Sequence, residues 1–102
     1  KYDPGEWLNM RYFFYNPEGP YWYRGYVNSD TLAPQLNSML NKYSSKIHVV
    51  AHTTRETITE KYNGKLLTTD LEDAATELLF LVRNRNKYKR YKIDSNGLKT
   101  EL

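Results

Sequence analysis

Two histidines, His48 and His52, are the first side chains of this sequence to consider for metal binding or acid–base chemistry. On a helix, a spacing of four would place both on one face, where they could share a metal ion. The residues around them form a strand pattern instead, and four residues of a strand span roughly 13 Å at about 3.3 Å each. We therefore expect two histidines on the surface of a sheet, with no shared metal ion and no cofactor.

The sequence shows no recognisable arrangement for nucleophilic catalysis. The chain has no cysteine, and a serine or threonine nucleophile needs a base and an orienting third group. No nucleophile-elbow motif is present. The acidic group Asp70, Glu72, Asp73 and Glu77 fits the start and the solvated face of a helix. The sequence therefore predicts a non-enzymatic protein without catalytic residues.

A basic segment near the C-terminus is the strongest signal for nucleic-acid binding. Two tyrosines lie among six cations within ten positions. The cations are Arg83, Arg85, Lys87, Lys89, Arg90 and Lys92. Cations hold phosphates, and tyrosine rings stack on the bases of single strands. Binding of single-stranded nucleic acid is therefore one functional hypothesis. The alternative is structural: a helix C-terminus followed by an edge strand that lysines protect from aggregation.

Length and composition predict one small globular domain over residues 1–102. The net charge of +3 permits binding to nucleic acid without requiring it. No apolar run approaches the roughly 20 residues that span a bilayer, and the polar first residues do not look like a signal peptide. The absence of cysteine fits an intracellular protein. We expect no membrane partner.

An internal repeat organises the predicted elements. Residues 8–46 align on 47–85 without a gap, and the hydrophobic period changes from two to about 3.6 at matching points. Each unit is predicted to be ββα, with strands over 8–15, 21–27, 47–52 and 57–66 and helices ending near 43 and 82. The fold class is therefore α+β: an antiparallel sheet with two helices on one face. A hairpin turn at 62–65 is the alternative to an unbroken strand over 57–66. Residues 88–93, in the basic segment 86–102, could form a fifth, edge strand.

The seam between the two units and an aromatic surface on the first hairpin are the predicted interaction site. Matched Tyr-x-Gly sequences occur at 23–25 and 62–64, where each glycine lets another backbone approach. A protein or an extended peptide would bind in this groove by strand addition. The predicted partner-binding residues are Phe13, Tyr15, Trp22, Tyr23, Gly25, Tyr26, Tyr62 and Gly64. A homodimer is one form that such a complex could take.

Ten tyrosines and no cysteine in 102 residues give the chain an unusual composition. In these features it resembles small orphan proteins of filamentous viruses of hyperthermophilic archaea, of the Acidianus filamentous virus type. The resemblance is compositional. It implies a viral protein of unknown function in the host cytoplasm, and it assigns no site residue.

Overall fold

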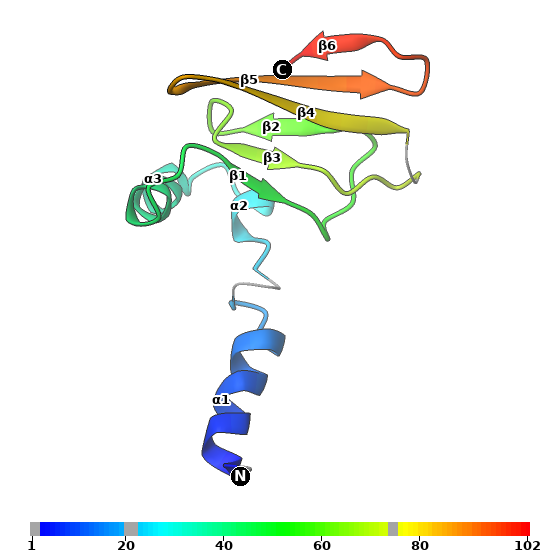
Figure 1. The fold of residues 1–102 in the computed structure, drawn as a ribbon. Coiled ribbons are helices and arrows are strands. Elements are labelled where there is room, and N and C mark those ends of the chain that lie inside the picture. The colour runs from blue at the N-terminus through cyan, green and yellow to red at the C-terminus, as the bar shows by residue number, and fades with distance from the viewer. Residues whose placement is uncertain (1–2, 20–22, 74–75) are drawn as a thin grey trace.

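The computed structural model describes residues 3–19, 23–73 and 76–102. Within them, three helices, α1 (Pro4–Tyr15), α2 (Gly25–Asn28) and α3 (Ala33–Lys42), precede all the strands. The strands are β1 (His48–Val50), β2 (Thr59–Lys61), β3 (Leu66–Thr68), β4 (Glu77–Asn84), β5 (Lys87–Asp94) and β6 (Lys99–Glu101). They form two three-stranded sheets that lie over one another, and α1 projects away from both (Figure 1). The predicted α+β class is confirmed.

The first sheet has the order β1-β3-β2, with β1 parallel and β2 antiparallel to the central β3. All three residues of β3 are buried, as expected for a strand covered on both faces. On one face, Leu66 packs with Val27 of α2 and with Leu36 and Leu40 of α3. Alternation directs Leu67 to the opposite face. The core therefore continues from the helices through this sheet.

The second sheet has the antiparallel order β4-β5-β6, and β4 pairs with β5 over eight residues. Polar side chains connect it to the first sheet. The Glu77 carboxylate accepts hydrogen bonds of 2.7 Å from the Thr57 hydroxyl and from the Ile58 N–H, and it lies 3.4 Å from Lys92 Nζ. Arg90 donates to the Gly64 carbonyl at 2.7 Å. Glu77 of β4 and Arg90 of β5, with their partners, therefore connect the two sheets.

The contacts of Glu77 make stability depend on pH. Burial acts to raise the pKa of Glu77, but the bonds from Ile58 and Thr57 and the Lys92 charge outweigh it and hold the pKa below its ordinary value. A carboxyl with a lowered pKa in the folded state stabilises the fold when ionised, and this contribution is lost as it becomes protonated. We expect stability to fall as the pH drops from about 4.5, the ordinary value, through the lower folded value. Urea unfolding at several pH values measures this loss, and Glu77→Gln should reduce the pH dependence in that window. An unchanged dependence in Glu77→Gln would show that other carboxyl groups cause it.

The first half of the chain differs from the prediction because it is helical. Residues 8–15, expected as a strand, lie in α1. Of the strand expected over 21–27, residues 25–27 lie in α2, and residues 21 and 22 lie outside the described part of the chain. Asp3 caps α1, since its carboxylate accepts from the Gly5 N–H at 2.8 Å, and Pro4 follows at the first helical position, where proline fits. These start signals and the local hydrogen bonds of the helix prevail over the β propensity of the aromatic residues.

The second half differs in the opposite sense. Residues 77–82, expected in a helix, lie in β4, where the apolar run Leu78–Val82 pairs with β5. A continuous apolar run fits a buried helix or a strand equally well, and the non-local pairing decides between them. The ββα order predicted for each unit is therefore wrong. Helices occupy much of the described part of 8–46, whereas the described part of 47–85 holds strands and no helix, so the two-repeat layout is not confirmed.

Other local predictions are confirmed. The predicted first helix corresponds to α3, and the predicted strand at 47–52 contains β1. The alternative turn at 62–65 separates β2 from β3, with positive φ at Tyr62, Asn63 and Gly64. The strand predicted at 88–93 is β5, but it is central in its sheet, so its assignment as an edge strand is wrong. No helix in the described part of the chain is both long and apolar enough to cross a bilayer.

Candidate functional site

A cavity of about 700 Å³ opens between the helices and the edge strand β1. Its volume falls in the range typical of small-ligand sites. Side chains from α3 and β1 and aromatic residues around α2 line it: Tyr23, Tyr26, Met39, Tyr43, His48 and His52 among others. The cavity therefore combines an aromatic wall with two imidazoles.

His52 lies just beyond the carboxyl end of β1 and is exposed. Its backbone has a φ of 67°, in the left-handed region that residues other than glycine seldom adopt. Its N–H donates to Asp70 Oδ2 at 2.8 Å. Uncommon backbone conformations held by surrounding contacts concentrate at functional sites. An imidazole at this position can bind an anion, move a proton or ligate a metal ion.

His48 belongs to the wall of the cavity. It is half-buried, and its ring meets the Tyr26 ring edge-on with 6.2 Å between centroids. Burial lowers the pKa of His48, which favours its neutral form at pH 7. Burial likewise raises the pKa of Tyr26, and the nearby Tyr23 and Tyr62 act in the same direction. The wall is therefore uncharged and aromatic, which suits the planar apolar part of a ligand.

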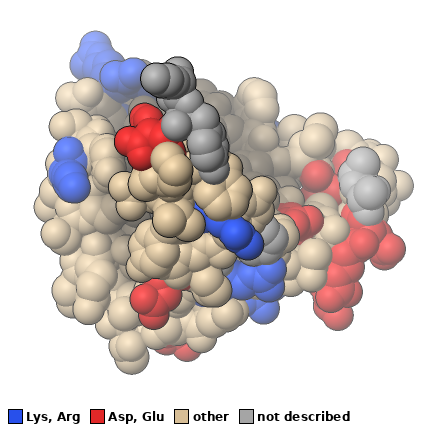
Figure 2. Space-filling view, turned by 90° about the horizontal axis from the view of Figure 1, so that it is seen from below, with Lys and Arg blue, Asp and Glu red and all other residues tan. Residues whose placement is uncertain are grey.

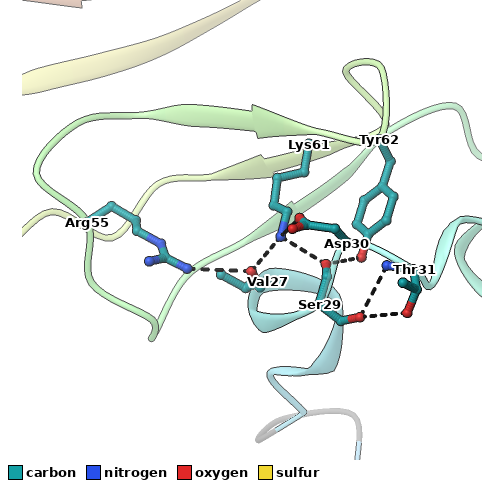
Figure 3. A network of polar contacts seen from close by, with 7 residues as sticks. All are labelled: Val27, Ser29, Asp30, Thr31, Arg55, Lys61 and Tyr62. Atoms are coloured by element: carbon teal, nitrogen blue, oxygen red, sulfur yellow. Dashed lines mark hydrogen bonds and ion pairs between the residues drawn. The ribbon is translucent and has the colours of Figure 1, made fainter.

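A polar network holds α2 against the first sheet (Figure 3). Lys61 Nζ donates to the Val27 and Ser29 carbonyls at 2.8 and 2.9 Å, and the Tyr62 hydroxyl also donates to the Ser29 carbonyl. A cation suits the negative end of a short helix, where carbonyls lack helical partners. This network fixes the helix that carries Tyr26, and so it shapes one side of the cavity.

The predicted partner-binding residues separate into three places. Tyr23 and Tyr26 line the cavity, with ring centroids 5.2 Å apart, while Phe13 and Tyr15 lie exposed on α1. Tyr62 packs against the core and anchors the network of Figure 3. Trp22 lies outside the described residues.

The two glycines of the predicted seam already face intramolecular neighbours. A Cβ on Gly25 would collide with the Tyr23 ring, and a Cβ on Gly64 would collide with the Arg90 guanidinium. Gly64 also has a φ of +77°, which disfavours any other residue. These glycines thus permit close packing within the chain. Binding of an outside backbone at the same places stays a prediction.

The six predicted phosphate-binding cations fall into two groups. Lys87 and Lys89 are exposed on β5, Arg83 is exposed near the end of β4, and Arg85 is exposed in the turn between the two strands. Arg90 and Lys92 are partly buried, pairing with Glu60 at 3.6 Å and with Glu77 at 3.4 Å respectively. The structure therefore leaves four of the six cations on the surface. Binding of nucleic acid there stays a prediction.

The described residues include no group of three His, Cys, Asp or Glu side chains placed to hold a metal ion. The sequence reasoning placed both histidines on a sheet surface, yet it missed the cavity beside them. Two of the aromatic residues that line it, Tyr23 and Tyr26, were assigned to a strand, and the contact between His52 and Asp70 joins residues 18 positions apart. No periodicity in the sequence reveals that contact.

Two solved structures share this fold. A cold-active protein tyrosine phosphatase superposes with a TM-score of 0.79 and 25% identity, over 92% of this chain and 28% of its own. A mutant of a cold-active protein tyrosine phosphatase gives 0.74 and 21% over the same shares. The chain thus spans little more than a quarter of the phosphatase chains it matches. No protein-family model and no curated protein matches the sequence.

Proposed function

We propose that this chain is a phosphoester-binding unit, in which His52 contacts the phosphate and the aromatic cavity holds the attached group. The observation that carries the proposal is the superposition of 92% of the chain on a protein tyrosine phosphatase with a TM-score of 0.79. An aryl phosphate, such as a phosphotyrosine side chain, combines the two chemical features that the site offers to recognise.

We assign separate roles to the two parts of the site. Tyr23, Tyr26 and Met39 provide aromatic and apolar surface for an aryl ring, because rings pack edge-on or offset against one another. His52 lies at the same cavity on the carboxyl side of β1, the side of an α/β sheet where ligands commonly bind. Its imidazole can donate a hydrogen bond to a phosphate oxygen.

Catalysis requires more than this pair of features. A phosphatase must also position a nucleophile and stabilise the charge of the transferring phosphoryl group. The described residues gather no metal-ligand set, and the sequence has no cysteine nucleophile. We therefore propose that the chain binds phosphoesters and does not turn them over alone. Groups from a larger polypeptide assembly would complete a catalytic site.

Titration with phenyl phosphate, followed by NMR, tests this function. We expect saturable shifts of the His52 ring and of the Tyr23 and Tyr26 rings, with a Kd on the order of 1 mM, about −4 kcal/mol, because few groups contact the ligand. Phenol and inorganic phosphate, the two halves of the probe, should each bind more weakly.

The matched variants are His52→Ala and Thr54→Ala, which truncate neighbouring exposed residues. His52→Ala should weaken binding of phenyl phosphate about tenfold, as expected from losing one hydrogen bond to a charged group. Thr54→Ala should bind normally. Equal affinities for both variants, or no saturable shift in the original chain, would contradict the proposal.

A second candidate function, association of the chain with a second copy of itself, is favoured by α1. The helix has apolar side chains on every side, yet none of its residues is buried. Leu8 is 59% exposed and Tyr12 is 71% exposed. Figure 2 views the molecule from the α1 end, and charged side chains on this face are scattered among many uncharged ones. A helix that is apolar all round is normally buried in a larger structure.

Self-association tests whether α1 binds protein. At a protein concentration of tens of micromolar, we expect the chain to sediment as an oligomer, because the exposed apolar side chains of α1 drive association. Leu8→Lys should shift it toward monomer, because a charge would interrupt the apolar surface. Asn9→Lys adds the same charge at a polar position of the same helix and should not. A chain that is monomeric at these concentrations would contradict this second function.

A further inference from the structure

We infer that Asp70 is a positioning residue for His52, and that its carboxylate holds the imidazole in the orientation that meets the phosphate. The inference rests on the proposed function. The contact that carries it is the 2.8 Å hydrogen bond from the His52 N–H to Asp70 Oδ2. This bond comes from the backbone N–H of His52 and joins the segment after β1 to the segment after β3. The two strands are parallel, so both segments lie at the same end of the sheet.

The left-handed backbone of His52 needs such a contact. A non-glycine residue in the left-handed region lies above its ordinary conformations in free energy. A hydrogen bond to a charged acceptor is among the stronger ones and can offset that cost. Without the bond, the backbone of His52 would relax to negative φ. Because φ sets the direction of the Cα–Cβ bond, the ring would then leave its place at the cavity.

The surrounding backbone keeps Asp70 itself in place. The Arg55 N–H donates to the Asp70 carbonyl at 2.9 Å, and the Glu72 N–H donates to the Arg55 carbonyl at 3.0 Å. The Thr69 N–H donates to the Val50 carbonyl at 2.9 Å. The two segments are therefore bonded on both sides of the His52–Asp70 contact. The Asp70 carboxylate adds one more hydrogen bond between these segments, at the point where the backbone of His52 turns away from β1.

Three variants separate the positioning role from a general effect of charge. Asp70→Ala removes the acceptor, Asp70→Asn keeps an acceptor oxygen without the charge, and Asp73→Ala removes a nearby exposed carboxylate of the same type. Each variant is studied as the full chain by NMR. One readout is the His52 intraresidue nuclear Overhauser effect between the N–H and Hα protons, which is strong at positive φ. The other is the Kd for phenyl phosphate.

We expect Asp70→Ala to lose the strong intraresidue effect at His52 and to weaken binding of phenyl phosphate about tenfold. Asp70→Asn should restore most of both, and Asp73→Ala should change neither. If Asp70→Ala does not fold, Asp70→Asn carries the test, since it should retain the strong effect at His52.

A His52 that keeps the strong effect in folded Asp70→Ala would overturn the inference, as would its loss in Asp70→Asn. Binding of phenyl phosphate that is unchanged in Asp70→Ala would overturn it as well. Failure of the proposed function looks different: the original chain would then show the strong effect at His52 and would not bind phenyl phosphate.

Discussion

Leu66→Ala is expected to destabilise the fold more than any other single truncation considered for this chain. Leu66 is fully buried in the central strand β3, where it packs with Leu36 and Leu40. Truncation removes apolar surface and leaves a cavity that well-packed neighbours cannot fill, at a cost of about 3–5 kcal/mol. Small domains have total stabilities of about 5–15 kcal/mol, so this loss threatens folding itself. Urea unfolding followed by circular dichroism measures it.

The matched control for this prediction is Leu78→Ala, at a leucine of β4 that is 65% exposed. It makes the same chemical change where little apolar surface is covered, so we expect a cost below about 1 kcal/mol. Similar costs for the two variants would show that β3 is not the centre of the core.

Lys61→Met is expected to have the second-largest effect. The Lys61 ammonium donates to two carbonyls at the end of α2, and its side chain is 23% exposed. Methionine keeps the apolar stem but removes two charged hydrogen bonds, which leaves the Val27 carbonyl with Arg55 and the Ser29 carbonyl with Tyr62, at a cost of about 1–3 kcal/mol. The loosened helix should also disturb the cavity wall, with shifts at the Tyr26 ring. Urea unfolding and the NMR spectrum of the aromatic rings measure the two effects.

The control for Lys61 separates its carbonyl contacts from its ion pair. Asp30 lies 2.7 Å from Lys61 Nζ, but its side chain is 89% exposed. A hydrogen bond from Lys61 and its charge hold the pKa of Asp30 below the ordinary value. Exposed ion pairs contribute little to stability, so Asp30→Asn should change the unfolding midpoint only slightly. An effect as large as that of Lys61→Met would assign the stabilisation to the ion pair instead.

The elements that could be predicted from the sequence are those with a single unambiguous period. Leu36, Met39, Leu40 and Tyr43 recur at helical spacing, and Pro34 suits the first turn, so the position of α3 was predicted correctly. Asn63 and the glycine after it likewise indicated a turn at 62–65 as the alternative to an unbroken strand over 57–66, and the structure confirms this alternative.

The elements that could not be predicted have apolar patterns that fit two structures. The aromatic residues of α1 alternate as in a strand, but they also surround a helix on every side, so periodicity does not discriminate. Leu78–Val82 is a continuous apolar run whose structure depends on its pairing with β5. The contact of His52 with Asp70 follows from the parallel pairing of β1 with β3. No local pattern indicates that pairing.

A phosphate group is proposed to bind beside His52, at the carboxyl end of β1. The most direct test is a crystal of the full chain soaked with tungstate, a phosphate analogue whose heavy atom gives a strong anomalous signal. We predict an anomalous peak within hydrogen-bonding reach of the His52 imidazole, and no such peak in crystals of His52→Ala. Ordered crystals at saturating tungstate with no peak beside His52, or an unchanged peak in His52→Ala, would contradict the account.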